Sequence, residues 1–307
     1  MRFKRLDLNL LVALDHMLEL RSVSAAADKM FMSQSAMSNA LTRIRTYFDD
    51  PLLIQVGRRM ELTPRAEALR PSIRDILVRI EATIETELEF RPDQSTRVFN
   101  ILLSDYSMRV LMPHVFAVAQ EQSATVRFNL NPQTEAPYAQ LERGEIDMLV
   151  SPRQFTSKDH PSSLLYEDDY VVVACKNGRY GGGKVDRAAF ETAGHVVMVP
   201  PNNAGAVESE FLESAGVTRK VEVTTFSFSN LPYLVAGTDR IATVHGRLAA
   251  LVARQNSLVV SKLPFSSLPL QQMIQWHAYR DLDPGLIWLR SAFAQAAARM
   301  ARYSPDQ

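Results

Sequence analysis

The residues that could carry chemistry stand on one face of a predicted helix over residues 34–48. The apolar positions of this segment step by four, three and four and so share the opposite face: Met37, Leu41, Ile44 and Phe48. The outward positions carry hydroxyl, amide and guanidinium groups and neither Lys nor Glu: Gln34, Ser35, Ser38, Asn39, Thr42 and Arg43. Such groups hydrogen bond to base edges and phosphates, whereas a merely solvated face usually carries Glu and Lys. The pattern predicts a DNA-reading helix, with a solvated polar face as the alternative.

The segment before this helix completes a predicted helix-turn-helix. Ser22 can cap a short helix over residues 23–30, and Ser33 can cap the helix over residues 34–48 after a tight connection. A small hairpin is predicted next, and its tip carries Arg58 and Arg59, which suit phosphate or minor-groove contacts.

A long helix is predicted after the hairpin. Thr63 can cap it, and Pro64 suits its first position. Its apolar residues again step by four, three and four: Leu69, Ile73, Ile76 and Ile80. About 25 residues of helix would measure about 38 Å and would have one apolar side. We expect this helix to pack on a second copy of itself, with packing on its own domain as the alternative.

From residue 96 onward strand and helix patterns alternate, which predicts α/β units with largely parallel sheets. Two breaks divide this region into two lobes, the first over residues 96–163 and 267–307 and the second over residues 164–266. Strand ends that face a cleft between two lobes are a usual place for a small ligand.

Several classes of protein fit this sequence poorly. The six His are scattered without metal-ligand spacing, and no nucleophile elbow, phosphate loop or dinucleotide fingerprint occurs, so neither an enzyme, a metal nor a cofactor is expected. Cys175 is the single cysteine and ends an apolar run, which favours an inert buried thiol over a redox sensor. A two-lobed transport protein is the remaining alternative. The polar residues that interrupt the apolar N-terminal stretch argue against a signal peptide, so a cytoplasmic protein without membrane contact is expected.

The balance of charge is uneven along the chain. The total of 34 basic and 34 acidic side chains gives a net charge of zero, which by itself argues against a nucleic-acid partner. Residues 1–74, however, hold 12 basic and 8 acidic side chains, so a mildly basic head precedes a mildly acidic remainder. We expect binding to depend on two half-sites more than on bulk charge.

Motifs along the whole chain resemble the LysR-type transcriptional regulators, in the NodD/LinR-like branch that also includes regulators of naphthalene, nitroaromatic and chlorinated-aromatic breakdown. They are DLNLL (7–11), SAAA (24–27), SQSAMSNALTRIR (33–45), DPLL (50–53), LTPRAEAL (62–69), ILLSDY (101–106), RGEID (143–147), GTDRIATV (237–244) and DPGLIWLR (283–290).

The resemblance implies an α+β multidomain fold: a winged helix-turn-helix over residues 1–62, a dimerising linker helix over residues 63–90, and a two-lobed α/β effector domain like a periplasmic binding protein. It implies a homodimer or homotetramer on double-stranded promoter DNA, switched by a small aromatic inducer. It favours an activator that works with RNA polymerase on genes of aromatic or chloroaromatic metabolism.

Site residues follow from the same resemblance. DNA contacts fall on Gln34, Ser35, Ser38, Asn39, Thr42 and Arg58. Two departures are Ser35, where many relatives have Pro, and Gln55, where many have Arg. Effector contacts fall on Ser104, Asp105, Tyr106, Pro132, Gln133, Thr134, Ser151–Arg153, Pro201, Asn202, Phe228 and His245. This set suits an aromatic ring with a hydroxyl or carboxylate, although Tyr106, Phe228 and His245 are equally compatible with ordinary packing.

Overall fold

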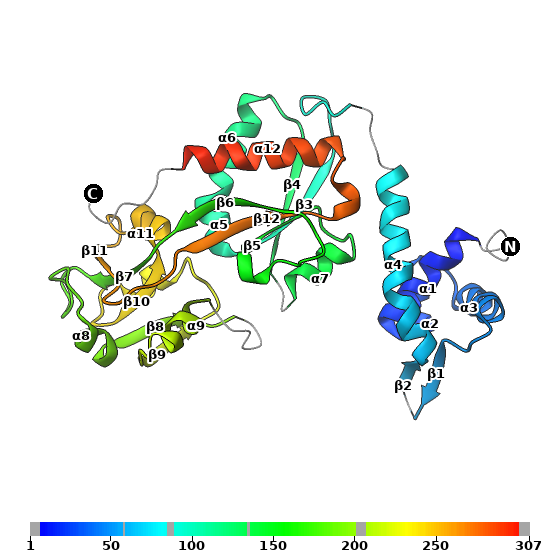
Figure 1. Ribbon diagram of the computed structural model, residues 1–307, viewed down its shortest axis with the longest axis horizontal. Helices are drawn as coiled ribbons and strands as arrows, with labels where there is room; N and C mark the ends of the chain where they lie inside the picture. The colour runs from blue at the N-terminus through cyan, green and yellow to red at the C-terminus, as the bar shows by residue number, and fades with distance from the viewer. Residues whose placement is uncertain (1–6, 58, 85–88, 134–135, 201–206, 301–307) are drawn as a thin grey trace. The chain divides into compact units, whose positions relative to one another are not determined.

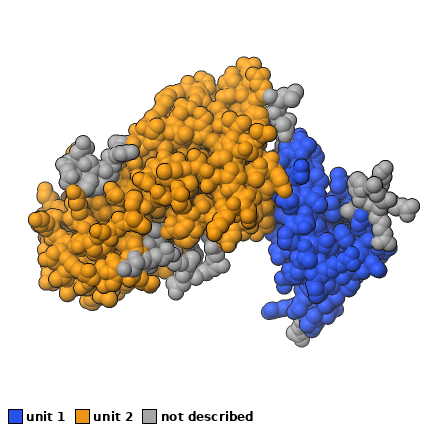
Figure 2. Space-filling model, in the orientation of Figure 1, with its two compact units in different colours: residues 1–86 blue, residues 87–307 orange. Residues whose placement is uncertain are grey.

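The computed structural model describes residues 7–57, 59–84, 89–133, 136–200 and 207–300. The chain forms two compact units, residues 1–86 and residues 87–307 (Figure 2). No helix within the described ranges has the length and apolar character needed to cross a membrane.

The first unit is a helix-turn-helix followed by a hairpin and a long helix (Figure 1). Its helices are α1 (Leu8–Leu20), α2 (Val23–Lys29), α3 (Gln34–Phe48) and α4 (Pro64–Ile84). The strands β1 (Leu53–Val56) and β2 (Arg59–Leu62) pair antiparallel, with Leu53 opposite Leu62 and Val56 opposite Arg59. The helix predicted over residues 34–48 is confirmed at both ends, and β1 and β2 form the predicted hairpin.

The helix starts are set by local hydrogen bonds, as the sequence predicts. The Ser22 hydroxyl accepts from the backbone N–H of Ala25, and the Ser33 hydroxyl accepts from that of Ala36, both at 3.2 Å. The Thr63 hydroxyl accepts from the N–H of Ala66 at 3.1 Å. Each hydroxyl satisfies an N–H group that the first helical turn leaves without a partner.

The long helix α4 begins on its own domain, which corrects part of the expected dimer face. Ile73 is only 3% exposed and Leu69 is partly buried, and both pack in the core formed by α1, α2 and α3. The Arg74 guanidinium also pairs with Asp15 of α1. Burial raises the pKa of Asp15, and Arg74 opposes that rise. The alternative of packing on its own domain therefore holds for Leu69 and Ile73. The described part of α4 has 21 residues, and the last part of the predicted helix lies outside the described residues.

The second unit has two lobes, each built on a five-stranded sheet. Lobe I has the strand order β4-β3-β5-β12-β6. Its elements are β3 (Val98–Leu103), α5 (Asp105–Val110), α6 (Met112–Glu121), β4 (Arg127–Pro132), α7 (Pro137–Glu142), β5 (Met148–Pro152), the 3-10 turn η2 (Arg153–Phe155), β6 (Ser162–Asp168), β12 (Leu270–Gln275), the 3-10 turn η4 (Ala278–Arg280) and α12 (Pro284–Arg299).

Lobe II has the strand order β11-β7-β10-β8-β9. Its elements are β7 (Tyr170–Cys175), α8 (Arg187–Thr192), β8 (Gly194–Met198), α9 (Val207–Ser214), β9 (Lys220–Thr225), α10 (Leu231–Val235), β10 (Ile241–His245), α11 (Gly246–Val252) and β11 (Leu258–Lys262).

The sheets are mixed, so the expectation of largely parallel sheets is wrong. β3 pairs parallel with β4 and β5, and β8 pairs parallel with β9 and β10. β12 runs antiparallel to β5 and β6, and β7 runs antiparallel to β10 and β11. The antiparallel pairs arise because β6 leads directly into β7 and because β12 returns from lobe II to lobe I.

Strand β6 was not predicted, and the expected lobe boundary between residues 163 and 164 falls inside it. Only Tyr166 and Asp168 of this strand are buried. Its sequence, SSLLYED, shows no alternation of apolar and polar residues, which is the pattern by which a strand is predicted. Helices α5 and α6 follow each other directly and meet at Leu111.

An ion-pair network joins the two ends of lobe I. Asp283 caps α12 by accepting from the backbone N–H groups of Gly285 and Leu286, and its carboxylate also binds both terminal nitrogens of Arg97 at 2.7 and 2.8 Å. Asp147 accepts from Arg97 at 3.2 Å. A Cβ atom at position 285 would lie 2.5 Å from an Arg97 nitrogen, so a larger residue there would displace the guanidinium from Asp283. Asp147 of the RGEID motif and Asp283 of the DPGLIWLR motif thus hold lobe I together through Arg97.

Candidate nucleic-acid interface and effector site

The polar face of α3 is exposed, as predicted. Gln34, Ser35, Ser38, Asn39, Thr42 and Arg43 are all exposed. The opposite face anchors the helix, because Met37, Leu41 and Ile44 are buried in the core of the first unit. Phe48 is partly buried against the same core. The geometry therefore leaves the first three turns of α3 open to a partner.

Some hydroxyl groups of this face already have partners within the helix. The Thr42 hydroxyl donates to the backbone carbonyl of Ser38 at 3.0 Å, and the hydroxyls of Ser33 and Ser35 lie 3.0 Å apart. Thr42 thus offers an acceptor oxygen and a methyl group rather than a free donor. The side-chain amides of Gln34 and Asn39 make no hydrogen bond within the described part of the chain, so they can both donate and accept outward.

The hairpin is held to α3 by a residue that the sequence reasoning missed. The Arg45 guanidinium donates to the carbonyls of Pro51 and Leu53, both at 2.7 Å, and so fixes β1 beside the end of α3. Asp50 accepts from the Thr63 hydroxyl and from the Leu52 N–H, also at 2.7 Å each, and the Thr63 bond lowers the pKa of that carboxyl. These bonds could not be predicted from the sequence alone, because they depend on where the hairpin lies relative to α3.

The structure describes one of the two arginines predicted at the hairpin tip. Arg59 is exposed at the start of β2, and Arg58 lies outside the described residues. The Gln55 side chain donates to the carbonyl of Gly57 at 3.2 Å. The Gln55 side chain is thus used within the hairpin turn.

The lobe I residues expected at the effector site stand at the ends of β3, β4 and β5 or directly after them. Ser104 caps α5 by accepting from the N–H of Ser107 at 3.2 Å. The Gln133 amide donates to the carbonyl of Val150 at 2.7 Å, directly before Ser151. Ser151 is buried, and its hydroxyl has no partner among the described residues. Arg153 is exposed in η2. Thr134, Pro201 and Asn202 lie outside the described residues.

Asp105 contacts lobe II directly. Its carboxylate accepts from the Ser227 hydroxyl at 2.6 Å, from the Ser229 N–H at 2.9 Å and from the Phe228 N–H at 3.3 Å. The Ser229 hydroxyl donates to the backbone carbonyl of Asp105 at 3.2 Å. Asp105 therefore joins the lobes, and its partners Ser227 and Ser229 carry no sequence motif that could have identified them.

Tyr106, Phe228 and His245 meet in an aromatic cluster that also includes Tyr170. The His245 ring lies 4.0 Å from the Tyr106 ring, 5.2 Å from the Phe228 ring and 4.9 Å from the Tyr170 ring. The structure thus brings together three of the predicted effector residues from both lobes. They also pack against one another, as the alternative interpretation of the sequence allowed.

A buried carboxylate, also missed from sequence, supports this cluster. The Tyr106 hydroxyl donates to Asp168 at 2.5 Å, and the backbone N–H of Arg247 donates to the same carboxylate at 3.2 Å. Burial raises the pKa of Asp168 to about 6 and lowers the pKa of His245 to about 3. At neutral pH the His245 imidazole is therefore neutral, whereas the Asp168 carboxylate, hydrogen-bonded to Tyr106, is mostly ionised.

Nothing in this arrangement resembles a metal centre. Within the described residues no three His, Cys, Asp or Glu side chains are grouped so that they could hold a metal ion. Cys175 is buried, and its sulfur accepts from the backbone N–H of Gly237 at 3.3 Å.

Comparisons with known proteins match both units of the chain to one family. Residues 8–67 match the family described as bacterial regulatory helix-turn-helix protein, lysR family, and residues 92–298 match the LysR substrate binding domain. Nodulation protein D 1 of Sinorhizobium fredii (strain NBRC 101917 / NGR234) is 38% identical over 301 residues, which cover 98% of this chain and 94% of that protein. Nodulation protein D 1 of Bradyrhizobium japonicum has the same identity and coverage. A probable transcriptional regulator from Pseudomonas aeruginosa, of known crystal structure, is 27% identical with a TM-score of 0.65, covering 95% of this chain and 97% of that one.

Proposed function

Because this chain belongs to the LysR family of bacterial transcriptional regulators, we propose that it activates genes of aromatic or chloroaromatic metabolism in response to a small aromatic effector. In this proposal the first unit recognises the promoter and the second unit binds the effector. The observation that carries the effector assignment is the aromatic cluster at the junction of the two lobes.

Promoter recognition is assigned to α3 and the hairpin. The exposed amides of Gln34 and Asn39 can each donate and accept, which suits bidentate contacts to adenine in the major groove. Ser35, Ser38 and Thr42 add hydroxyl groups, and Arg43 adds a cation. Arg58 and Arg59 of the hairpin are assigned to phosphates or to the minor groove. The exposure of the α3 face supports this assignment.

The effector site is assigned to the junction of the lobes. Tyr106, Phe228 and His245 offer apolar ring surfaces, and Ser104, Asp105, Gln133 and Ser151 stand at nearby strand ends. The buried Ser151 hydroxyl, without a partner among the described residues, can serve a ligand hydroxyl. Thr134, Arg153 and Asn202 complete the proposed set. An aromatic ring with a hydroxyl or carboxylate matches this chemistry.

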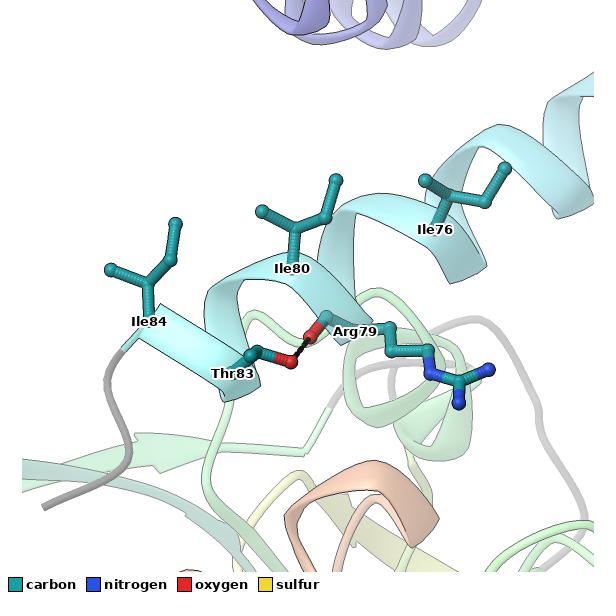
Figure 3. Close-up of a pocket in the computed structure, with 5 residues that line it drawn as sticks. All are labelled: Ile76, Arg79, Ile80, Thr83 and Ile84. Carbon is teal, nitrogen blue, oxygen red and sulfur yellow. Dashed lines mark hydrogen bonds between the residues drawn. The ribbon is translucent and has the colours of Figure 1, made fainter. Parts of the chain in front are cut away.

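Self-association is assigned to the far end of α4. Figure 3 shows Ile76, Ile80 and Ile84 projecting from the same side of the helix, where with Arg79 and Thr83 they line an open depression. Ile76 is 46% exposed and Ile84 is 77% exposed. An exposed isoleucine stripe at a spacing of four suits a second copy of the helix. A homodimer through α4, doubled to a homotetramer, then places two reading heads on adjacent half-sites.

Switching then requires that the effector favours one arrangement of the assembly on DNA. A difference in affinity worth about 1–3 kcal/mol between the two arrangements is enough for a switch. Activation further requires that the favoured arrangement makes promoter DNA accessible to RNA polymerase or contacts the polymerase itself.

The effector assignment is tested with a panel of phenols, hydroquinones and benzoates. We expect at least one to raise the unfolding temperature of the full-length chain and to change its footprint on promoter DNA. The same compound should lose its effect in the Phe228→Ala variant. A panel that leaves both stability and footprint unchanged would exclude an aromatic effector, and a response that survives in Phe228→Ala would exclude this site.

A further inference from the structure

Phe31, in the turn between α2 and α3, is fully exposed. Its side chain is 100% exposed, and the next residue, Met32, is 38% exposed. A single exposed apolar side chain is ordinary on a protein surface. Phe31 is unusual because its backbone conformation is also unfavourable.

The backbone of Phe31 is left-handed, with a φ of 53°. The N–H of Met32 donates to the carbonyl of Ala27 at 2.9 Å, and the N–H of Phe31 donates to that of Asp28 at 3.1 Å. This pair of bonds is the Schellman motif, which ends a helix on a left-handed residue that is usually Gly. A bulky side chain at such a position is strained.

Leu52 shows how the same strain is normally compensated. Its φ is 59°, but its side chain is 0% exposed and belongs to the core of the first unit. The other non-glycine residues with positive φ in the described ranges are polar or charged: Arg21, Asp49, Ser123 and Ser257. Phe31 is therefore the one large apolar residue among them whose strain no burial offsets.

We propose that Phe31 contacts DNA, packing its ring against thymine methyl groups at the rim of the groove that α3 enters. This inference rests on the proposed assignment of α3 to promoter recognition. Phe31 precedes Gln34 by three residues, so their Cα atoms are at most about 11 Å apart. Aromatic contact with the thymine methyl group is one of the standard ways in which a side chain reads a base. The bound duplex supplies the burial that the free protein lacks.

The proposal is tested on the duplex that the full-length wild-type chain selects most strongly from a random pool. Replacing Phe31 by Gly relieves the backbone strain and removes the ring. We expect Phe31→Gly to bind this duplex about tenfold more weakly, while its unfolding temperature stays the same or rises. Phe31→Leu keeps an apolar side chain and should regain most of the affinity. Ser123→Gly relieves a left-handed residue far along the chain and should leave affinity unchanged.

A duplex with uracil in place of thymine tests the methyl contact itself. The difference in affinity between wild type and Phe31→Gly should shrink about fourfold on this DNA, because one lost methyl contact is worth about that factor. An unchanged difference on uracil DNA would overturn the thymine contact. Unchanged affinity of Phe31→Gly on normal DNA, or a loss of affinity together with a lower unfolding temperature, would overturn the DNA contact. Failure of the wild type to select any duplex would instead refute the assignment of α3.

Discussion

The carboxylate of Asp105 accepts a hydrogen bond from the backbone N–H of Ser229 at 2.9 Å, although the two residues belong to different lobes. The Ser227 hydroxyl adds a second donor at 2.6 Å. The first helix of lobe I is thereby bound to the loop before α10 of lobe II. Because both lobes contribute backbone as well as side chains, a change in the lobe arrangement must break or stretch these bonds.

Replacing Asp105 by Ala should loosen the contact between the lobes. Hydrogen bonds to a charged group contribute about 1.5–3 kcal/mol each, but here part of the loss is recovered as water reaches the freed N–H groups. We expect the free energy of unfolding in urea to fall by about 1–3 kcal/mol, and amide exchange at residues 228 and 229 to speed up. Asp159→Ala, on an exposed residue of lobe I, is the matched control. Slow exchange at residue 229 in Asp105→Ala would contradict the bridging role.

The buried His245 should make stability depend on pH. Burial lowers its pKa to about 3 in the folded chain, whereas the unfolded chain binds the proton below about 6.5. The neutral imidazole thus contributes full stability above pH 6.5, and that contribution is lost as the pH falls toward 3. Between pH 7 and pH 5 the loss amounts to at most about 2 kcal/mol. Urea unfolding of wild type and His245→Phe at both pH values measures it.

The comparison with His245→Phe removes the contribution of other groups. Asp168 works in the opposite direction, because its pKa is raised to about 6, so its contribution to stability falls as the pH rises from about 4 to 6. His195, with a pKa lowered to about 4 by burial, works in the same direction as His245. Both groups remain in His245→Phe, so the variant should show a smaller loss on acidification. An equal loss in both proteins would show that the imidazole of His245 is not the cause.

Local features of the fold were predictable from sequence, and long-range ones were not. Ser22, Ser33 and Thr63 cap helices through bonds that span three residues, so the sequence alone indicates them. Strand β6 pairs with β12, which lies more than 100 residues later in the chain. The sequence of β6 itself shows no alternation of apolar and polar residues. The directions of the strands in this sheet depend on that pairing, so the expectation of largely parallel sheets was wrong.

The two candidate sites differ in the same way. The reading face of α3 depends on helical periodicity, so its exposed residues follow from spacing. The junction of the lobes depends on contacts such as Tyr106 with His245 and Asp105 with Ser229, which join residues 139 and 124 positions apart. Sequence motifs pointed to Asp105 and Tyr106 but could not show that both are already engaged with lobe II.

Replacing Ser38 and Asn39 of α3 together by Ala should reduce sequence preference and spare non-specific binding. Both side chains are exposed and stand among the polar groups assigned to base edges. Loss of a good base contact costs about 1–3 kcal/mol, which is about 5- to 150-fold in affinity for the selected duplex. Binding to random DNA depends on phosphates and should change little. Competition between the two duplexes at fixed salt measures the ratio.

Thr46→Ala is the matched control for this double variant. Thr46 is exposed on the last turn of the same helix, and its hydroxyl donates to the carbonyl of Thr42. It should discriminate between the duplexes as the wild type does. If the double variant also discriminates like the wild type, the assignment of base contacts to Ser38 and Asn39 is wrong.

Replacing Ile76 and Ile84 of α4 together by Asp should produce monomers. Ile76 and Ile84 are exposed, so the change should leave the fold of the first unit intact while placing charges in the proposed helix–helix contact (Figure 3). Ile73→Asp is the informative contrast, because Ile73 is buried in the domain core and its replacement should unfold the first unit instead. Sedimentation velocity distinguishes monomer from dimer, and circular dichroism reports the helix content. A double variant that sediments as the wild-type oligomer would place the main interface elsewhere on the chain, and a double variant that loses helix content as Ile73→Asp does would mean that this end of α4 serves its own domain.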